Sequence, residues 1–286
     1  MTPYDLRMKA KKYIEDAKLL LDSSPANAFY LAGYAVEFTL KARLCVTRKW
    51  PRMPRSLKEC QNWNKRDGYD NKDRIFIHDL DELLSLSDSI RIKKSTFTKI
   101  DWERACTWNE QVRYEKDDSK SKEEASMYID EVEKVVHELN MLDLLTILLD
   151  IEIRVSKKYG SFHCFALIKR IDGHWDILFS YISRTQDIFD KRHAETVDLL
   201  RTEIDSDLKS NITQNLNIGY DAPILSGLYA LLNSFFGGLE HSFYSSLSDN
   251  ITVGFPSFPP AYVITAANWD LAGLNKQWDE LETQES

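Results

Sequence analysis

The segment YLAGYAVEFTLKARL, residues 30–44, places an ionisable pair inside a strongly apolar stretch. Its spacing predicts a helix, and one helical face then carries Tyr30, Tyr34, Glu37 and Lys41, because each residue advances about 100° around the axis. Two interpretations fit this stripe. It is either a solvent-exposed face with an i,i+4 ion pair contributing about 0.3 kcal/mol, or a polar strip facing a groove between elements.

Apolar residues on both sides of this stripe predict that the helix is packed on two flanks. Gly33 beside the stripe would allow another part of the backbone to approach closely. One flank holds Phe29, Val36 and Leu40, and the other holds Leu31, Ala35 and Phe38.

Two further features could bind phosphate. Arg113, followed by Tyr114, offers a planar fork of donors that can hold a phosphate through two hydrogen bonds. A basic run between residues 41 and 58 contains no acid and includes Trp50, so it could attract phosphates and stack a base, or simply form a solvated loop. Its cations are Lys41, Arg43, Arg48, Lys49, Arg52, Arg55 and Lys58.

The remaining reactive side chains do not form a recognisable catalytic or metal-binding set. His163 and Cys164 are adjacent in an expected strand, so their side chains point to opposite faces. His174 and His193 are scattered, and the four cysteines have no C-x-x-C pair. We therefore expect no catalytic residue of a standard kind, no metal, no cofactor, and reduced structural thiols.

Composition places the chain among globular proteins. It has 286 residues and a net charge of -8. Residues 1–150 hold 26 Lys and Arg against 27 Asp and Glu, so most of the acidity lies in the second half. No secretory leader and no apolar run of about 18 residues occurs, which predicts a cytoplasmic protein without a membrane segment.

The pattern along the chain predicts an α+β protein with two domains, 1–149 and 150–286. The first is expected to be an all-helical bundle and the second an antiparallel α+β domain, with Asp172-Gly173 in a hairpin turn. The expected helices cover residues 4–21, 25–49, 78–86, 101–115, 125–150, 190–211 and 222–236, with an irregular connection at 50–73. The expected strands lie in 151–156, 162–170 and 174–182, with two more in 250–269.

Residues 4–145 resemble the HEPN domain, a helical bundle of bacterial defence and toxin-antitoxin proteins. The resemblance rests on residues 10–44, on HDLDELL at 78–84, and on WNEQVRYE at 108–115. Glu37 and Lys41 match an E-x-x-x-K pattern, and Arg113-Tyr114 matches an RY pair before the last helix. The family's ribonucleases carry R-x(4-6)-H at that place. Here YEKDDSKSK follows Arg113, so the histidine is missing.

The resemblance implies a nucleotide- or RNA-binding protein of a prokaryotic defence or toxin-antitoxin system. The ligand-binding residues would be Tyr34, Glu37, Lys41, Arg113 and Tyr114, and the domains would pair as a homodimer. One alternative is a metal-independent ribonuclease that uses another histidine, His78 or His137. A second alternative is an oligomerisation scaffold whose C-terminal domain binds a protein partner.

Overall fold

The computed structural model describes residues 1–69, 75–87, 99–114, 119–160, 162, 164–169, 175–180, 186–217 and 261–266. The chain divides into two compact units, Met1–Thr146 and Ile147–Ser286.

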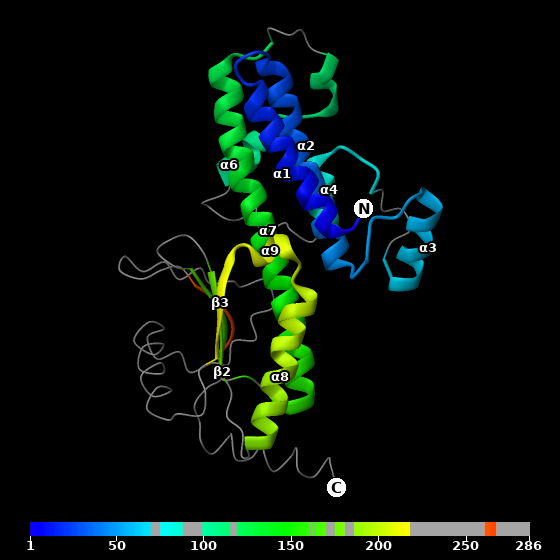
Figure 1. Cartoon of the computed structure of the whole chain (residues 1–286). Helices are drawn as coiled ribbons and strands as arrows, with labels where there is room; N and C mark the ends of the chain where they lie inside the picture. The colour runs from blue at the N-terminus through cyan, green and yellow to red at the C-terminus, as the bar shows by residue number, and fades with distance from the viewer. Residues whose placement is uncertain are drawn as a thin grey trace. The chain divides into compact units, whose positions relative to one another are not determined.

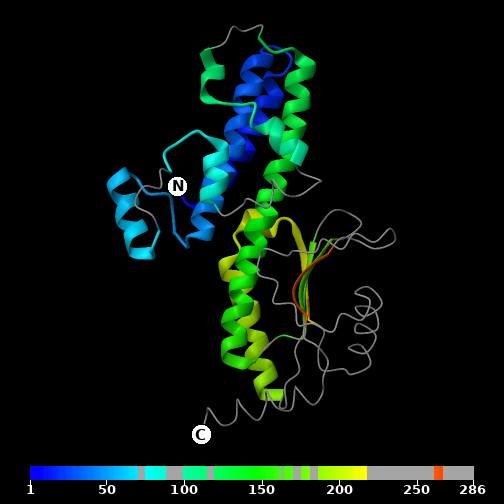
Figure 2. The same cartoon turned by 180° about the vertical axis from the view of Figure 1, so that it is seen from behind.

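Two long helices begin the first unit and lie side by side (Figures 1 and 2). Helix α1, Pro3–Leu20, starts with a capping box: the Thr2 hydroxyl accepts a hydrogen bond from the Asp5 backbone N–H at 3.1 Å, and the Asp5 carboxylate accepts one from the Thr2 N–H at 2.8 Å. Helix α2, Pro25–Thr47, has Ser24 as N-cap and Pro25 in its first turn. The predicted starts of both helices are confirmed.

Shorter helices follow. They are α3 (Leu57–Asp67), α4 (Leu80–Leu86), α6 (Lys99–Ala105) and the 3₁₀ helix η1 (Glu110–Tyr114), before the long helix α7 (Lys122–Tyr159). Of these, α4 and η1 pack against α2. The expectation of an irregular connection at 50–73 is wrong because of α3. This helix is mostly polar, but Ser56 caps its start at 3.2 Å from the Glu59 N–H, and Gly68 ends it with φ of +79°.

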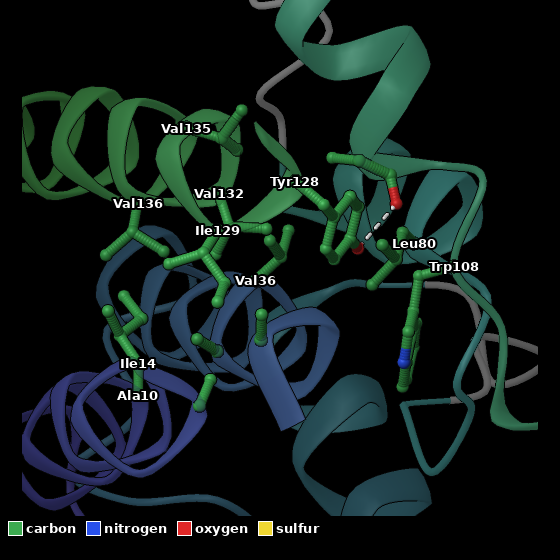
Figure 3. Close-up of a cluster of buried hydrophobic side chains, with 14 of the residues drawn as sticks. Ala10, Ile14, Val36, Leu80, Trp108, Tyr128, Ile129, Val132, Val135 and Val136 are labelled. Carbon is green, nitrogen blue, oxygen red and sulfur yellow. Dashed lines mark hydrogen bonds between the residues drawn. The ribbon is translucent and has the colours of Figure 1, made fainter. Parts of the chain in front are cut away.

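The core of the first unit joins α1, α2, α4 and the N-terminal part of α7 (Figure 3). The Tyr128 hydroxyl donates a hydrogen bond to the Ala105 carbonyl at 3.1 Å, so the ring is buried with its polar end satisfied. The labelled members are Ala10, Ile14, Val36, Leu80, Trp108, Tyr128, Ile129, Val132, Val135 and Val136.

A second, smaller hydrophobic cluster, called here the α3 cluster, lies at the C-terminal end of α2. Its members are Leu6, Ala42, Leu44, Cys45, Trp50, Met53, Cys60 and Ile75. Burial raises the pKa of the Cys45 thiol to about 12, so this sulfur stays protonated.

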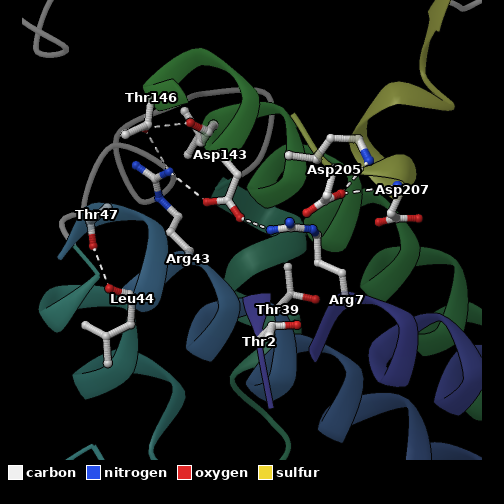
Figure 4. A network of polar contacts seen from close by, with 12 residues as sticks. Thr2, Arg7, Thr39, Arg43, Leu44, Thr47, Asp143, Thr146, Asp205 and Asp207 are labelled. Atoms are coloured by element: carbon white, nitrogen blue, oxygen red, sulfur yellow. Dashed lines mark hydrogen bonds and ion pairs between the residues drawn. The ribbon is translucent and has the colours of Figure 1, made fainter. Parts of the chain in front are cut away.

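A buried ionic network ties three helices of the first unit together (Figure 4). Arg7 of α1 contacts one Asp143 oxygen at 2.8 Å, and Arg43 of α2 contacts the other at 3.1 Å and donates to Thr146 Oγ1 at 3.2 Å. The side chains of Arg7, Arg43 and Asp143 are 1%, 3% and 0% exposed. Burial raises the pKa of Asp143, and the two guanidinium groups act in the opposite direction.

Among its described residues, the second unit contains the C-terminal part of α7, a four-stranded sheet and two further helices. The sheet order is β3-β2-β1-β4, with β1 at Cys164–Lys169, β2 at Trp175–Ser180, β3 at Ile212–Asn217 and β4 at Ala261–Ala266. Strand β1 is antiparallel to β2 and β4, whereas β2 and β3 are parallel. Between β2 and β3 the chain forms α8 (Gln186–Glu203), which runs beside the end of α7, and α9 (Ser206–Lys209).

The predicted α+β class with an antiparallel second domain is wrong. The described part of the chain is predominantly helical, and the β2–β3 pairing is parallel. Residues 151–156 are not a strand but part of α7. Ile151 and Val155, four residues apart, are both fully buried, and no helix breaker occurs before Gly160, which has φ of +87°.

Several expected features fall outside the described residues. These are the Asp172-Gly173 turn, the helix at 222–236, the first strand of 250–269, and His163 and His174. In the described part of the chain, no helix has the length and apolar character needed to cross a membrane.

Replacing Asp143 with Asn should destabilise the protein by about 3–5 kcal/mol, because two buried guanidinium groups would lose their anionic partner. Urea denaturation would measure the loss, provided that the slope of the unfolding free energy against urea concentration is unchanged. Asp16→Asn is the matched control, since Asp16 pairs with Lys12 on the surface of α1 at 3.1 Å and should change stability by about 0.5 kcal/mol or less. Equal losses in the two variants would contradict the assigned role.

Candidate functional site

The carboxylate of Glu37 is the centre of the polar stripe on α2. Its side chain is 2% exposed, and its two oxygens contact the Lys41 ammonium at 2.5 Å and His78 Nδ1 at 2.8 Å. A solvent-exposed face is therefore the wrong interpretation of this stripe. The flanks explain the burial: Val36 and Leu40 on one side and Ala35 on the other are fully buried, which forces Glu37 inward with them.

The two partners of Glu37 differ in accessibility. The Lys41 side chain is 12% exposed and its ammonium is held by the carboxylate, so it mainly neutralises Glu37. His78 lies just before α4 and its side chain is 42% exposed. Because Nδ1 contacts Glu37, we infer that Nε2 is the nitrogen available to a ligand.

Tyr34 lies between His78 and a second tyrosine. Its ring meets the His78 ring edge-on at 6.1 Å, and its hydroxyl forms a 2.9 Å hydrogen bond with the Tyr30 hydroxyl. Burial, followed by the hydrogen bond to Tyr30 and the charge of Glu37, raises the pKa of Tyr34 well above its ordinary value. Tyr34 is therefore a neutral phenol at physiological pH.

Arg113 lies on the other side of this phenol pair. Its guanidinium donates to the Tyr114 hydroxyl and stacks over the Tyr114 ring, with 4.5 Å between the guanidinium carbon and the ring centroid. Hydrogen bonds to Tyr114 and then Tyr30 raise the pKa of Arg113. The result is an exposed, permanently charged group next to Tyr30 and Tyr34.

Trp108 fixes η1, and with it Arg113, against α2. Its indole N–H donates to the Tyr30 carbonyl at 3.0 Å, and its ring packs edge-on against Tyr34 with centroids 5.0 Å apart. A Cβ atom at Gly33 would lie 2.1 Å from Trp108 Cγ, so only glycine leaves room for the indole. The close approach expected at Gly33 is therefore made by this side chain.

We call Tyr30, Tyr34, Glu37, Lys41, His78 and Arg113 the α2 polar site. Of the predicted ligand-binding residues, Tyr34, Glu37 and Lys41 are contiguous, and Arg113 and Tyr114 adjoin them through Tyr30. Besides Lys41, Glu37 contacts His78. Sequence reasoning named His78 only as an alternative catalytic histidine. It missed the contact of His78 with Glu37, and it missed Trp108, because neither residue shares a local spacing with α2.

The basic run at residues 41–58 does not form a single exposed patch. Arg43 is buried against Asp143, Arg48 donates to Asn64 at 2.7 Å, and Arg52 pairs with Glu59 at 2.6 Å. Trp50 is 2% exposed and is not accessible for stacking a base. The remaining exposed cations of the run include Arg55 and Lys58.

The described residues contain no cluster of three or more His, Cys, Asp or Glu side chains arranged for a metal ion. His193 is half-buried against the rings of Phe179 and Phe189, with centroid distances of 5.9 and 6.3 Å. Its surroundings are thus those of a packed aromatic side chain.

Gly33→Ala should destabilise the first unit by about 1–3 kcal/mol, because the new methyl group overlaps the Trp108 ring. The same change in a Trp108→Leu background should cost at least about 1 kcal/mol less, since the clash is gone. Thermal or urea denaturation of the four proteins gives the coupling directly. Strictly additive costs would show that the two positions do not interact.

Comparison of the chain with protein-family models, with curated protein sequences and with solved structures finds no significant match in any of the three. The function proposed below therefore rests on the chemistry of this chain's own residues and on the motif resemblance described above.

Proposed function

We propose that this protein binds the phosphate groups of a nucleotide or of RNA at the α2 polar site. The observation that carries this proposal is Arg113: an exposed guanidinium, held by two phenols, beside the hydrogen-bonded Tyr30–Tyr34 pair. Arginine is suited to phosphate because its donors match two phosphate oxygens at once. The neighbouring phenols can donate further hydrogen bonds.

The other residues near Arg113 have supporting roles in this proposal. Lys41 and Glu37 neutralise each other in a nearly buried pair, which places His78 without adding net charge. Tyr114 is 68% exposed, so the ring face turned away from Arg113 can stack on a base. In this proposal Lys41 supports the site from within, and Arg113 makes the main phosphate contact.

We also propose that the first unit is HEPN-like and works in the cytoplasm, within a prokaryotic defence or toxin-antitoxin system. The i,i+4 contact of Glu37 with Lys41 and the placement of Arg113-Tyr114 before the long helix α7 support this proposal. A homodimer and a protein partner for the C-terminal unit belong to it. The apolar flanks of α2 are used within the bundle, so the dimer surface must lie elsewhere, and sedimentation velocity at tens of micromolar tests for it.

Arg113→Ala should weaken binding of a short RNA oligonucleotide about 10-fold or more while changing stability by less than about 0.5 kcal/mol, because the side chain is exposed. Arg113→Lys should recover part of the affinity, since it keeps the charge and loses the fork. Fluorescence anisotropy at fixed salt measures both. Lys58→Ala is the control: an equal loss there would point to nonspecific attraction.

A second candidate function, a metal-independent ribonuclease, is favoured by one observation. The 2.8 Å contact between Glu37 and His78 Nδ1 resembles the arrangement in which a carboxylate orients a histidine for proton transfer. A neutral His78 could then accept the proton of a ribose 2′-hydroxyl at Nε2 while Arg113 holds the phosphate.

Incubation with unstructured RNA and with total tRNA separates the two candidates. Under the binding proposal the RNA stays intact. Cleavage that His78→Gln abolishes, but that His137→Gln on the exposed face of α7 leaves unchanged, would establish the ribonuclease instead. A general-base role also requires the cleavage rate to fall as the pH is lowered, because a base must be unprotonated to accept the proton.

A further inference from the structure

The charges of the α2 polar site do not contribute equally toward a ligand. Glu37 and Lys41 are in contact at 2.5 Å, with side chains 2% and 12% exposed, so they cancel each other before a ligand arrives. The groups left to face an anion are Arg113, always positive, and His78, positive only when protonated. The charge that faces a ligand is therefore +1 when the His78 imidazole is neutral and +2 when it is protonated.

The contact with Glu37 determines what His78 can do in each state. In the neutral ring, the carboxylate requires the proton on Nδ1, which leaves Nε2 as an acceptor that repels a phosphate oxygen. In the protonated ring, Nδ1 still donates to Glu37, and Nε2–H becomes a charged donor. A phosphate at Nε2 thus requires a protonated His78.

The charged and titratable groups around His78 come from α2, from its own segment and from η1. From α2 it meets Glu37 directly, Tyr34 edge-on at 6.1 Å, and Lys41 through Glu37. Within its own segment, Asp79 accepts from the Glu82 N–H at 2.9 Å, and Asp81 accepts from the Trp102 indole at 3.1 Å. Arg113 of η1 lies beyond the Tyr30–Tyr34 pair.

We propose that the α2 polar site recognises a terminal phosphate monoester, at the end of a nucleotide or of an RNA strand, and takes up one proton on His78 as it binds. This inference rests on the proposed phosphate-binding function and names its ligand class. A monoester carries a charge of about −1.5 to −2 at pH 7, which matches Arg113 together with protonated His78. An internal phosphodiester carries one negative charge and needs Arg113 alone.

The direction of the pH dependence follows from this linkage. Binding of a phosphate dianion that takes up a proton on His78 should weaken as the pH rises, by up to about 10-fold per pH unit, because the proton comes from solution. A ribonuclease using His78 as a base would show the opposite dependence, because it needs the neutral ring.

Isothermal titration calorimetry at pH 7.5 tests the proposal, in two buffers with different ionisation enthalpies. The ligands are a 5′-phosphorylated uridine trinucleotide, the same trinucleotide with a 5′-hydroxyl, and uridine 5′-monophosphate. At this pH the monoester is already almost fully ionised, so proton uptake reports the protein. We expect the phosphorylated trinucleotide to bind about 10-fold tighter than the hydroxyl form, with uptake of about 0.5–1 proton.

His78→Gln should remove the proton uptake and reduce the preference for the 5′-phosphate to about 3-fold or less, since an amide donates without titrating. His137→Gln is the matched control and should change neither quantity. If uridine 5′-monophosphate binds as well as the phosphorylated trinucleotide, the ligand is a free nucleotide. If the mononucleotide binds more weakly, the ligand is the end of an RNA strand. Either result supports recognition of a terminal phosphate.

Two results would overturn this inference while leaving phosphate binding intact. The first is equal affinity for the two trinucleotides, and the second is binding without proton uptake. In both cases Arg113→Ala must still lower the affinity. If none of the three ligands binds, or if binding is indifferent to Arg113→Ala, the proposed function itself is wrong.

Discussion

A carboxylate buried in the middle of α2 constrains the whole surface around it. The Glu37 side chain is 2% exposed. An unpaired charge at that depth would be so costly that the protein would unfold or the carboxylate would take up a proton. Lys41 supplies a cation from the same helix, and His78 brings in the segment before α4. One turn further back, Gly33 admits Trp108, which holds η1 in place. The side chains of the α2 polar site therefore depend on a single helix whose buried face is partly polar.

Some of this arrangement was accessible from sequence, for identifiable physical reasons. The helix starts at Thr2 and Ser24-Pro25 follow local rules that act within a few residues, and both predictions are confirmed. The partnership of Glu37 with His78 joins positions 41 residues apart and depends on tertiary packing, so no local spacing could reveal it. Gly33 gave a usable hint, because a glycine inside a buried helix suggests close approach, although it did not identify Trp108.

The errors arose where one pattern fits two structures. Residues 151–156 alternate like a strand, yet Ile151 and Val155 are also four apart and line one face of α7. Helix α3 was missed because it buries little, chiefly Cys60 and Asn64. Strands β2 and β3 can pair in parallel because the α8 connection carries the chain back across the sheet. The local pattern of each strand does not reveal this direction.

The buried cysteines of the α3 cluster can report when α3 separates from the end of α2. The thiols of Cys45 and Cys60 are both fully buried, and burial raises the pKa of Cys45 to about 12, whereas Cys106 is only partly buried. Thiolates react with alkylating reagents far faster than thiols. Among the cysteines whose side chains are described, labelling of the native protein should therefore begin at Cys106. Modification of the other two then marks how often α3 detaches from the end of α2.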